Sequence, residues 1–274
     1  MQKKWVLLAV AFFVLGISVP GAAQEGGAGD FNFRDGPFTA DIEGIADVRV
    51  PAFYVFADAK NTKKIMKASG NLVTGIEVGL VAPEDLSWFV VFEFSEVGYV
   101  KDDEKDKLDP DAMFDQMLED NQAANEERKR EGIPALNLID WEMAPKYNEY
   151  TNNLEWAIRL RDEEGTNHVN HNVRVLGRKG VMIVTLVVED VDLYAKLPDF
   201  YKVMGDFAFT KGQKYAEYRS GDKIAKYGLS ALVVGGATVL AAKSGLFKYI
   251  WKILVLLGAG IAGFFKKLFG KKEK

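Results

Sequence analysis

The two histidines of the chain, His168 and His171, are three residues apart, a spacing that could bind one metal ion. On a helix, side chains three residues apart lie on the same face, whereas on a strand they point to opposite faces. Asp162–Glu164 could add oxygen ligands to two imidazoles. The neighbouring residues Gly165–Asn167 and Asn170 are typical of a loop or of the start of a strand. The sequence therefore favours polar loop histidines, with a metal site at His168 and His171 as the alternative.

A run of six acidic residues between positions 102 and 111 could bind calcium through carboxylate oxygens. The acids are Asp102, Asp103, Glu104, Asp106, Asp109 and Asp111. Lysines alternate with them, and the spacing and central glycine of an EF-hand loop are absent. A solvated loop that leads to a helix cap explains the run without a metal.

No pattern for nucleophilic catalysis or phosphate binding stands out. The chain has no cysteine and no G-x-S-x-G sequence. The segment Gly177-Arg178-Lys179-Gly180 offers cations and backbone amides to an anion, but it lacks P-loop spacing and therefore favours a plain turn. Nothing singles out a pair of carboxylates for glycoside chemistry. We therefore predict no catalytic residue, no metal and no cofactor.

Tyrosines and lysines gather in residues 211–228, where the last apolar part of the chain begins. Such residues suit the headgroup level of a membrane, and the alternative is a surface that docks a partner protein. The candidate docking residues are Tyr215, Tyr218, Lys223 and Tyr227. Residues 213–226 are called the collar below.

Both ends of the chain predict contact with a membrane. Lys3 and Lys4 precede an apolar run, and the small residues Gly21–Ala23 follow it, which is the layout of a secretory signal peptide over residues 1–23. Residues 24–36 are predicted to form a flexible leader that is rich in glycine.

Near the C-terminus, residues 227–242 and 253–265 carry no charge, and lysines flank them. We predict a membrane-anchoring segment of one or two helices over residues 227–265 and a basic tail over residues 266–274. The number of crossings stays open, because each uncharged run is short for a bilayer.

Charge is distributed unevenly along the chain. The whole chain has a net charge of −4, but residues 24–226 carry 25 basic and 38 acidic side chains. A domain with this excess of acidic side chains repels the phosphate backbone of nucleic acids, which argues against a nucleic-acid partner. Because the chain has no cysteine, disulfides cannot hold the domain together and its core must do so alone.

The strand and helix patterns in residues 37–212 predict an exported α+β domain. We expect an antiparallel sheet of about five to seven strands with helices on one side. Strand patterns occur at residues 53–56, 88–94, 154–160, 172–176 and 181–188, and the last two form a hairpin around the turn at 177–180. Helix patterns occur at residues 58–69, from Pro110 to about residue 131, and at 190–204, where Pro198 interrupts the last.

Four blocks of the sequence stand out in order: Gly98–Asp103, Asn125–Arg128, Val175–Gly180 and Gly221–Gly228. Together they resemble the bacterial family called domain of unknown function 2167, and the likeness runs from about Asp41 to the C-terminus. That family is described as predicted membrane-anchored proteins, so the resemblance implies a bacterial protein that faces the cell envelope. The resemblance implies no activity and no functional residue.

We therefore predict a membrane-anchored, non-enzymatic interaction or scaffold module, whose partners are the lipid bilayer and a protein of the envelope. Its expected location is the cytoplasmic (inner) membrane of a bacterium, with the main domain on the periplasmic side. Two alternatives stay open. One is an envelope hydrolase that uses carboxylates or a histidine-bound metal, and the other is a domain that binds a small ligand or a lipid.

Overall fold

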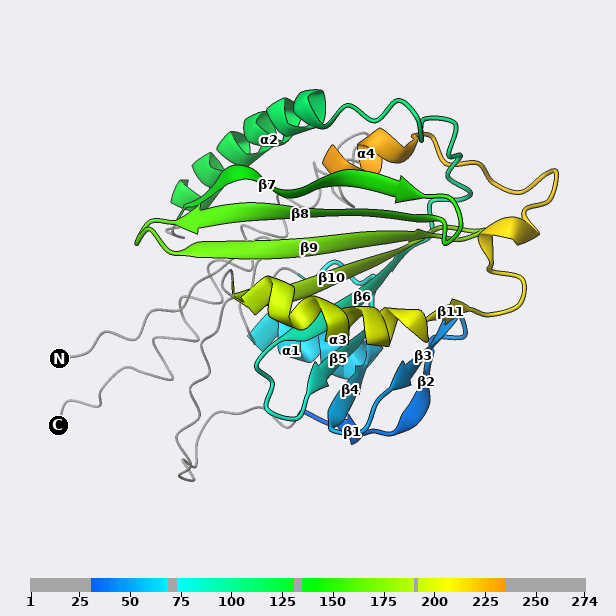
Figure 1. Cartoon of the computed structure of the whole chain (residues 1–274). Helices are drawn as coiled ribbons and strands as arrows, with labels where there is room; N and C mark the ends of the chain where they lie inside the picture. The colour runs from blue at the N-terminus through cyan, green and yellow to red at the C-terminus, as the bar shows by residue number, and fades with distance from the viewer. Residues whose placement is uncertain (1–30, 69–72, 131–134, 190–191, 235–274) are drawn as a thin grey trace, which may run out of the picture.

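The computed structural model describes residues 31–68, 73–130, 135–189 and 192–234 (Figure 1). The predicted signal peptide, the basic tail and the part of the predicted membrane segment after Val234 lie outside these residues. Within the described ranges, no helix is long and apolar enough to cross a membrane.

An eight-stranded antiparallel sheet forms the centre of the fold. From one edge to the other its order is β1 (Arg34–Asp35), β4 (Tyr54–Asp58), β5 (Glu77–Pro83), β6 (Phe89–Ser95), β10 (Val181–Glu189), β9 (Asn167–Leu176), β8 (Asn153–Asp162) and β7 (Leu136–Asn148). A smaller sheet has the order β11 (Ala208–Phe209), β3 (Ala46–Val50) and β2 (Phe38–Ile42). The predicted antiparallel α+β fold is confirmed. The predicted number of strands is too small, because β1 and β11 are only two residues long and the register shifts of β7 break the regular alternation of a strand.

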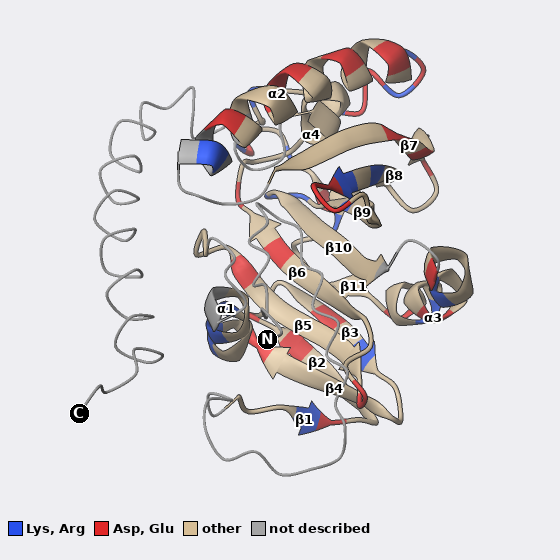
Figure 2. Cartoon of the chain, turned by 90° about the vertical axis from the view of Figure 1, so that its left-hand side faces the viewer, with Lys and Arg blue, Asp and Glu red and all other residues tan. Residues whose placement is uncertain are grey.

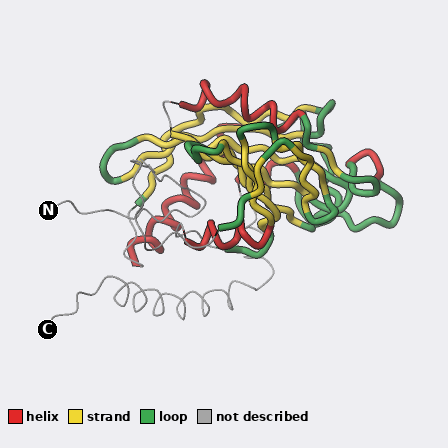
Figure 3. The backbone as a smooth tube through the Cα atoms, turned by 90° about the horizontal axis from the view of Figure 1, so that it is seen from below, coloured by secondary structure: helices red, strands yellow, loops and turns green. Residues whose placement is uncertain are grey.

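Helices lie on both faces of the central sheet (Figures 2 and 3). They are α1 (Ala59–Ala68), α2 (Pro110–Arg130), α3 (Leu193–Gly205) and α4 (Leu229–Val234). The smaller sheet and α3 pack on one face, whereas α1, α2 and α4 pack on the other. The prediction that all helices lie on one side is therefore wrong. Its physical reason is that the central strands are apolar on both faces, and each face needs a cover.

Strand β6 illustrates this burial on two sides. Its residues Val90 and Phe92 belong to the core beneath α3, while Val91 belongs to the core beneath α1. Two neighbouring strands, β5 and β10, complete its hydrogen bonds. The predicted interior strand at residues 88–94 is thus confirmed, and the predicted hairpin of β9 and β10 is confirmed by the pairing of Leu176 with Val181.

Aspartates cap two helices at their N-termini, and the cap that follows the acidic run was predicted. The Oδ1 atom of Asp58 accepts a hydrogen bond from the Asn61 amide at 2.8 Å, at the start of α1. In the same way, Asp109 Oδ1 accepts from the Ala112 amide at 3.1 Å, at the start of α2. Each bond satisfies an amide that has no partner within the helix, and such caps contribute about 1 kcal/mol.

Helix α3 continues through Pro198, although an interruption was predicted there. A proline inside a helix costs about 3 kcal/mol, because it removes one hydrogen bond and crowds the preceding turn. Three side chains of α3, those of Leu193, Phe200 and Val203, are fully buried on either side of the proline. Their burial contributes about 2 kcal/mol each and outweighs the cost of the proline.

Two asparagines of α2 protect the outer edge of β7. The side chain of Asn125 both accepts from the Leu136 amide (3.0 Å) and donates to the Leu136 carbonyl (3.1 Å). Asn121 donates to the same carbonyl (2.8 Å) and accepts from the Leu138 amide (3.1 Å). These side-chain amides take the place of a neighbouring strand, so this stretch of the edge is closed to another chain.

Candidate functional site at the collar

The collar lies at the end of the sheet where β6 and β9 finish and β10 begins (Figure 1). It contains a short 3-10 helix, η2 (Tyr215–Glu217). Two segments that are distant from it in the sequence hold it in place.

The first segment follows β6. The Tyr99 amide donates to the Lys223 carbonyl, and the Ala225 amide donates to the Tyr99 carbonyl, each at 2.8 Å. Gly98 has a φ of +100°, and a Cβ at this position would lie only 2.5 Å from the Lys223 carbonyl oxygen. Both the backbone conformation and the close approach therefore require glycine.

The second segment is the turn between β9 and β10. The Arg178 guanidinium donates to both carboxylate oxygens of Asp222, at 2.7 and 2.8 Å, and this pair lowers the pKa of Asp222 to about 2. The Arg178 amide donates to the Gln213 carbonyl at 2.8 Å, at the start of the collar. The predicted turn is confirmed, but its bonds to the collar could not be foreseen from the spacing of its glycines.

A stack of three tyrosines fills the space between the first segment and the collar. The ring of Tyr99 lies 4.4 Å from that of Tyr215 and 4.3 Å from that of Tyr218, measured between centroids. The Tyr215 hydroxyl donates to the Val100 carbonyl at 3.0 Å. Burial raises the pKa of Tyr215. Tyr215 thus packs inward, whereas Tyr218 keeps 40% of its surface exposed.

The other two candidate docking residues also contact the domain. The Lys223 ammonium donates to the Glu96 carbonyl at 3.1 Å. Tyr227 is half-buried, and burial raises its pKa to about 12. The structure therefore brings Tyr215, Tyr218 and Lys223 together around the 96–103 segment, and their docking role stays a prediction.

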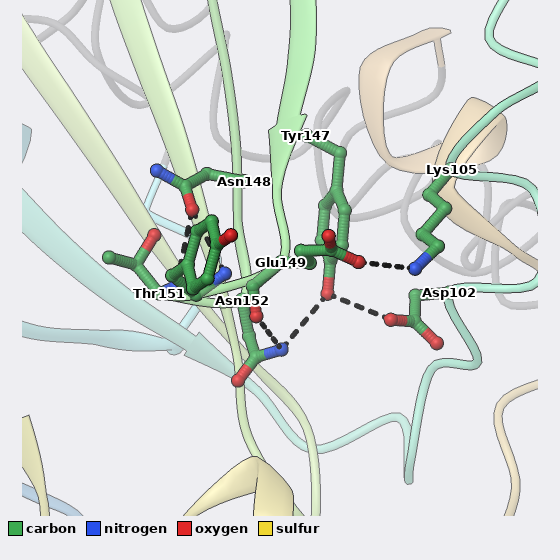
Figure 4. Close-up of polar contacts among 8 residues, drawn as sticks. Asp102, Lys105, Tyr147, Asn148, Glu149, Thr151 and Asn152 are labelled. Carbon is green, nitrogen blue, oxygen red and sulfur yellow. Dashed lines mark hydrogen bonds and ion pairs between the residues drawn. The ribbon is translucent and has the colours of Figure 1, made fainter.

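The acidic run continues the first segment, and three of its carboxylates, those of Asp102, Glu104 and Asp109, accept hydrogen bonds within the protein (Figure 4 shows Asp102). Asp102 accepts from the Tyr147 hydroxyl at 3.2 Å, and Lys105 pairs with Glu149 in the turn between β7 and β8. The same Tyr147 hydroxyl accepts from Asn152 at 3.2 Å. With Asp109 as a helix cap, the predicted loop and cap are confirmed. Among the described residues, no group of three metal-binding side chains converges.

Glu104 of this run holds the start of α4. Its Oε2 atom accepts from the Ser230 amide at 3.0 Å, and a Cβ at Gly228 would lie 2.2 Å from its Oε1 atom. Leu229 and Leu232 of α4 are buried against the core beneath α2. The first helical residues of the predicted membrane segment 227–265 therefore pack in the domain core, while the extent of that segment stays a prediction.

The two histidines are not brought together. Both lie on β9, which starts at Asn167, so their side chains point to opposite faces. His168 Nε2 lies 2.9 Å from Asp162 on the face of α2, and His171 Nε2 lies 2.7 Å from Glu155 on the face of α3. Both are buried, so the expectation of loop histidines is corrected.

Sequence reasoning missed a set of charged side chains inside the central sheet, in which Glu77 and Arg174 are buried and Glu93 is half-buried. Arg174 is buried, with its guanidinium 4.7 Å from the centre of the Trp156 ring. Glu93 lies on β6, two strands away from Arg174. Burial and the nearby Glu77 raise the pKa of Glu93 to about 7, although Arg174 opposes the shift. The charge of Glu93 within an otherwise apolar strand was the one signal for this set.

Three of the four sequence blocks noted above meet at the collar. Gly98–Asp103 and Val175–Gly180 provide the two segments, and Gly221–Gly228 includes the part of the collar that they bind. The fourth block, Asn125–Arg128, begins with the asparagine that covers the edge of β7.

A sequence-family model described as "Protein of unknown function (DUF2167)" matches residues 35–265. No curated protein matches the sequence. Among solved structures, the chain is similar to the solution structure of cyanobacterial PsbP (CyanoP) from Synechocystis sp. PCC 6803, at 13% identity and a TM-score of 0.39. That match covers 69% of this chain and 98% of the other. A likeness of this degree carries no argument about function.

Proposed function

Because the chain belongs to the DUF2167 family of proteins of unknown function, we propose a function from its own geometry: a non-enzymatic interaction module, tethered to a membrane by its C-terminal segment. The domain would meet a partner in the envelope, and the tether would keep both on one surface. Such confinement raises the effective concentration of the partner.

The rigid collar is the observation that carries this proposal. A flexible linker would leave a tethered domain free to tumble. Here the collar is fixed by the Arg178–Asp222 pair, the backbone bonds of Tyr99 and the cap that Glu104 provides to α4. Because this junction is rigid, it would set the orientation of the domain relative to the segment that follows α4.

Exposed apolar and aromatic side chains at this end of the sheet support contact with the headgroup layer. Tyr218 and Ile224 of the collar are 40% and 37% exposed, and Tyr150 in the turn between β7 and β8 is 93% exposed. Tyrosine is enriched where a protein meets the membrane–water interface, because its ring is apolar and its hydroxyl polar.

The sequence at the two ends supports the location. A signal peptide over residues 1–23 would export the domain, and the uncharged runs after α4 would hold it at the membrane. We place the domain on the periplasmic side of the cytoplasmic membrane. The hydrolase alternative is not proposed, because His168 and His171 point to opposite faces and each is bonded to its own carboxylate.

Extraction and protease accessibility test the proposal on the full chain. Membranes that contain the protein are washed with high salt and with alkaline carbonate, and then extracted with detergent. We expect release only by detergent, and digestion of the domain when protease is added to the outside of spheroplasts. Release without detergent would overturn the tether, and full protection from external protease would overturn the periplasmic location.

A further inference from the structure

Phe53 lies in the turn between β3 and β4 with 76% of its surface exposed. Its backbone φ is +67°, in the left-handed region that an aromatic residue adopts only at a cost. Glycine would adopt this conformation without strain. The turn therefore holds a large apolar ring in solvent, in a conformation that disfavours such a residue.

Leu86 repeats this combination in the adjacent turn between β5 and β6. Its φ is +52°, and 38% of its surface is exposed. One hydrogen bond joins the two turns, from the Glu84 amide to the Phe53 carbonyl at 3.0 Å. Phe53 and Leu86 are called the tip below.

The tip lies at the end of the sheet opposite to the collar. Strand β6 leads from the Leu86 turn at one end to the collar at the other, and β4 and β5 meet the Phe53 turn at the tip end. The seven residues of β6 span roughly 23 Å. A domain held at its collar therefore presents the tip away from its attachment.

Packing within the domain does not account for Phe53. It belongs to none of the apolar clusters that the described residues form. Strained backbone at an exposed position is found at binding and switch sites, where the strain serves a function. Aromatic residues, phenylalanine among them, are also enriched in protein interfaces relative to the rest of the surface.

The charges around the tip indicate its partner. Glu84 and Asp85 precede Leu86 and are exposed. Hydrogen bonds from the amide and hydroxyl of Ser87 lower the pKa of Asp85, which keeps this carboxylate charged. Asp199 of α3 adds a further exposed acid close to Tyr54. Three basic residues lie near the tip as well: Lys196, which acts on Asp85, and Arg49 and Lys202, which line a hollow with Pro51 and Ala52. The charged residues of the two turns themselves are the acids Glu84 and Asp85. Because these acids are repelled by an anionic membrane surface and the tip lies opposite to the collar, a protein with basic groups fits the tip better than a bilayer.

We propose that Phe53 and Leu86 form an anchor that inserts into an apolar pocket, rimmed by lysine or arginine, on a partner protein. This inference rests on the proposed function, since it names the surface through which the tethered module binds. The strained turns present the two side chains in a fixed position, which reduces the entropy lost on binding.

Site-specific photocrosslinking in cells tests the proposal first. Benzoylphenylalanine is introduced into the full chain at position 53, at 86 and, as a control, at Glu43, an exposed residue with a φ of +52° in the turn between β2 and β3. We expect one protein to crosslink from positions 53 and 86 and not from 43. Crosslinks to lipid only, to a second copy of this chain, or to nothing would each overturn the proposal.

Binding of the crosslinked protein in purified form is the second test. We expect Phe53→Gly to weaken binding about tenfold or more, as loss of an interface anchor does, without lowering the melting temperature. Glu43→Gly relieves a similar backbone strain at a site outside the tip and should leave binding unchanged. An affinity of Phe53→Gly within threefold of the wild type would overturn the proposal.

Failure of the tether and failure of the tip are distinguishable. If the protein is released without detergent but still crosslinks through position 53, the tether is wrong and the anchor stands. If the protein requires detergent but position 53 captures no partner, the tether stands and the anchor is overturned.

Discussion

Arg178 and Asp222 are 44 residues apart in the sequence, yet the guanidinium of one donates to both carboxylate oxygens of the other. A bidentate pair of this kind fixes an orientation as well as a distance. It joins the turn between β9 and β10 to the collar, where the 96–103 segment also binds. The junction between the sheet and α4 is therefore set by contacts that are distant in sequence.

Arg178→Lys should loosen the collar, because an ammonium cannot make the bidentate contact. We expect amide hydrogen exchange in residues 213–226 to become about tenfold faster. The neighbouring exposed variant Lys179→Ala is the control and should exchange like the wild type. Because the pKa of Asp222 is about 2, wild-type protection should persist until the pH falls towards that value. Equal exchange in Arg178→Lys and Lys179→Ala would show that the pair does not hold the collar.

Glu93 should make the stability of the domain depend on pH. Its pKa is about 7 in the folded protein, against an ordinary value of 4.5, so the folded state favours the protonated carboxyl. The protonated Glu93 carboxyl stabilises the folded state fully below pH 4.5, and this stabilisation is lost as the pH rises to about 7. The free energy of unfolding should fall by up to about 3 kcal/mol over this range.

Glu93→Gln should remove this dependence, because the amide does not ionise and has a similar shape. Urea unfolding of the wild type and of Glu93→Gln between pH 4 and 8 measures the free energy of unfolding of each. The pH range over which the two curves diverge is the range over which Glu93 titrates. Glu96→Gln, at an exposed position three residues further on, should show the same change in the free energy of unfolding with pH as the wild type. Parallel curves for the wild type and Glu93→Gln would contradict the assignment.

Asn121→Ala with Asn125→Ala should open the edge of β7. The change leaves the amides of Leu136 and Leu138 without their side-chain partners, at a cost of about 2 kcal/mol in the free energy of unfolding. It also exposes an edge that can pair with another chain, so light scattering should rise with protein concentration. Gln116→Ala, on the exposed surface of α2, should change neither quantity. A double variant as stable and monodisperse as Gln116→Ala would show that the edge needs no cover.

Periodicity predicted the strands that alternate or are buried on both faces, namely β6, β8, β10 and the end of β9. It failed at the start of β9, because His168, Asn170 and Asn172 form a polar row that is buried. Polar side chains in a sequence normally indicate solvent, and only the finished sheet shows that these face the interior. The position of α3 was predicted, but its continuation through Pro198 was not, because the burial of Phe200 outweighs the cost of the proline only in the folded domain.

The collar could be located from its tyrosines and lysines but not understood from them. Spacing alone does not show that Tyr99 lies between Tyr215 and Tyr218, since these contacts join residues more than 100 positions apart. The tip had no sequence signal, because a positive φ at Phe53 is a property of the folded backbone.

Tyr215 and Tyr218 differ in burial, and their substitution should separate a structural role from a docking role. Tyr215→Ala removes a buried ring from the stack on Tyr99, which should lower the free energy of unfolding by about 3 kcal/mol. Tyr215→Phe keeps the ring and loses only the hydrogen bond to Val100, at about 1 kcal/mol. Tyr218→Ala should cost less than either core change, because its other face is in solvent. Urea unfolding of the purified full chain in detergent measures all three.

The same variants then test contact with the membrane. A photocrosslinker at Ile224, the exposed neighbour of this stack, should react with lipid in wild-type membranes. Tyr218→Ala should reduce that yield while the fold persists, because the exposed ring would no longer hold the collar at headgroup level. Tyr215→Phe should leave the yield unchanged, since its hydroxyl is directed inward. A yield that is insensitive to Tyr218 would leave the stack with a structural role only, and the rigid collar would then orient the domain without contacting the bilayer.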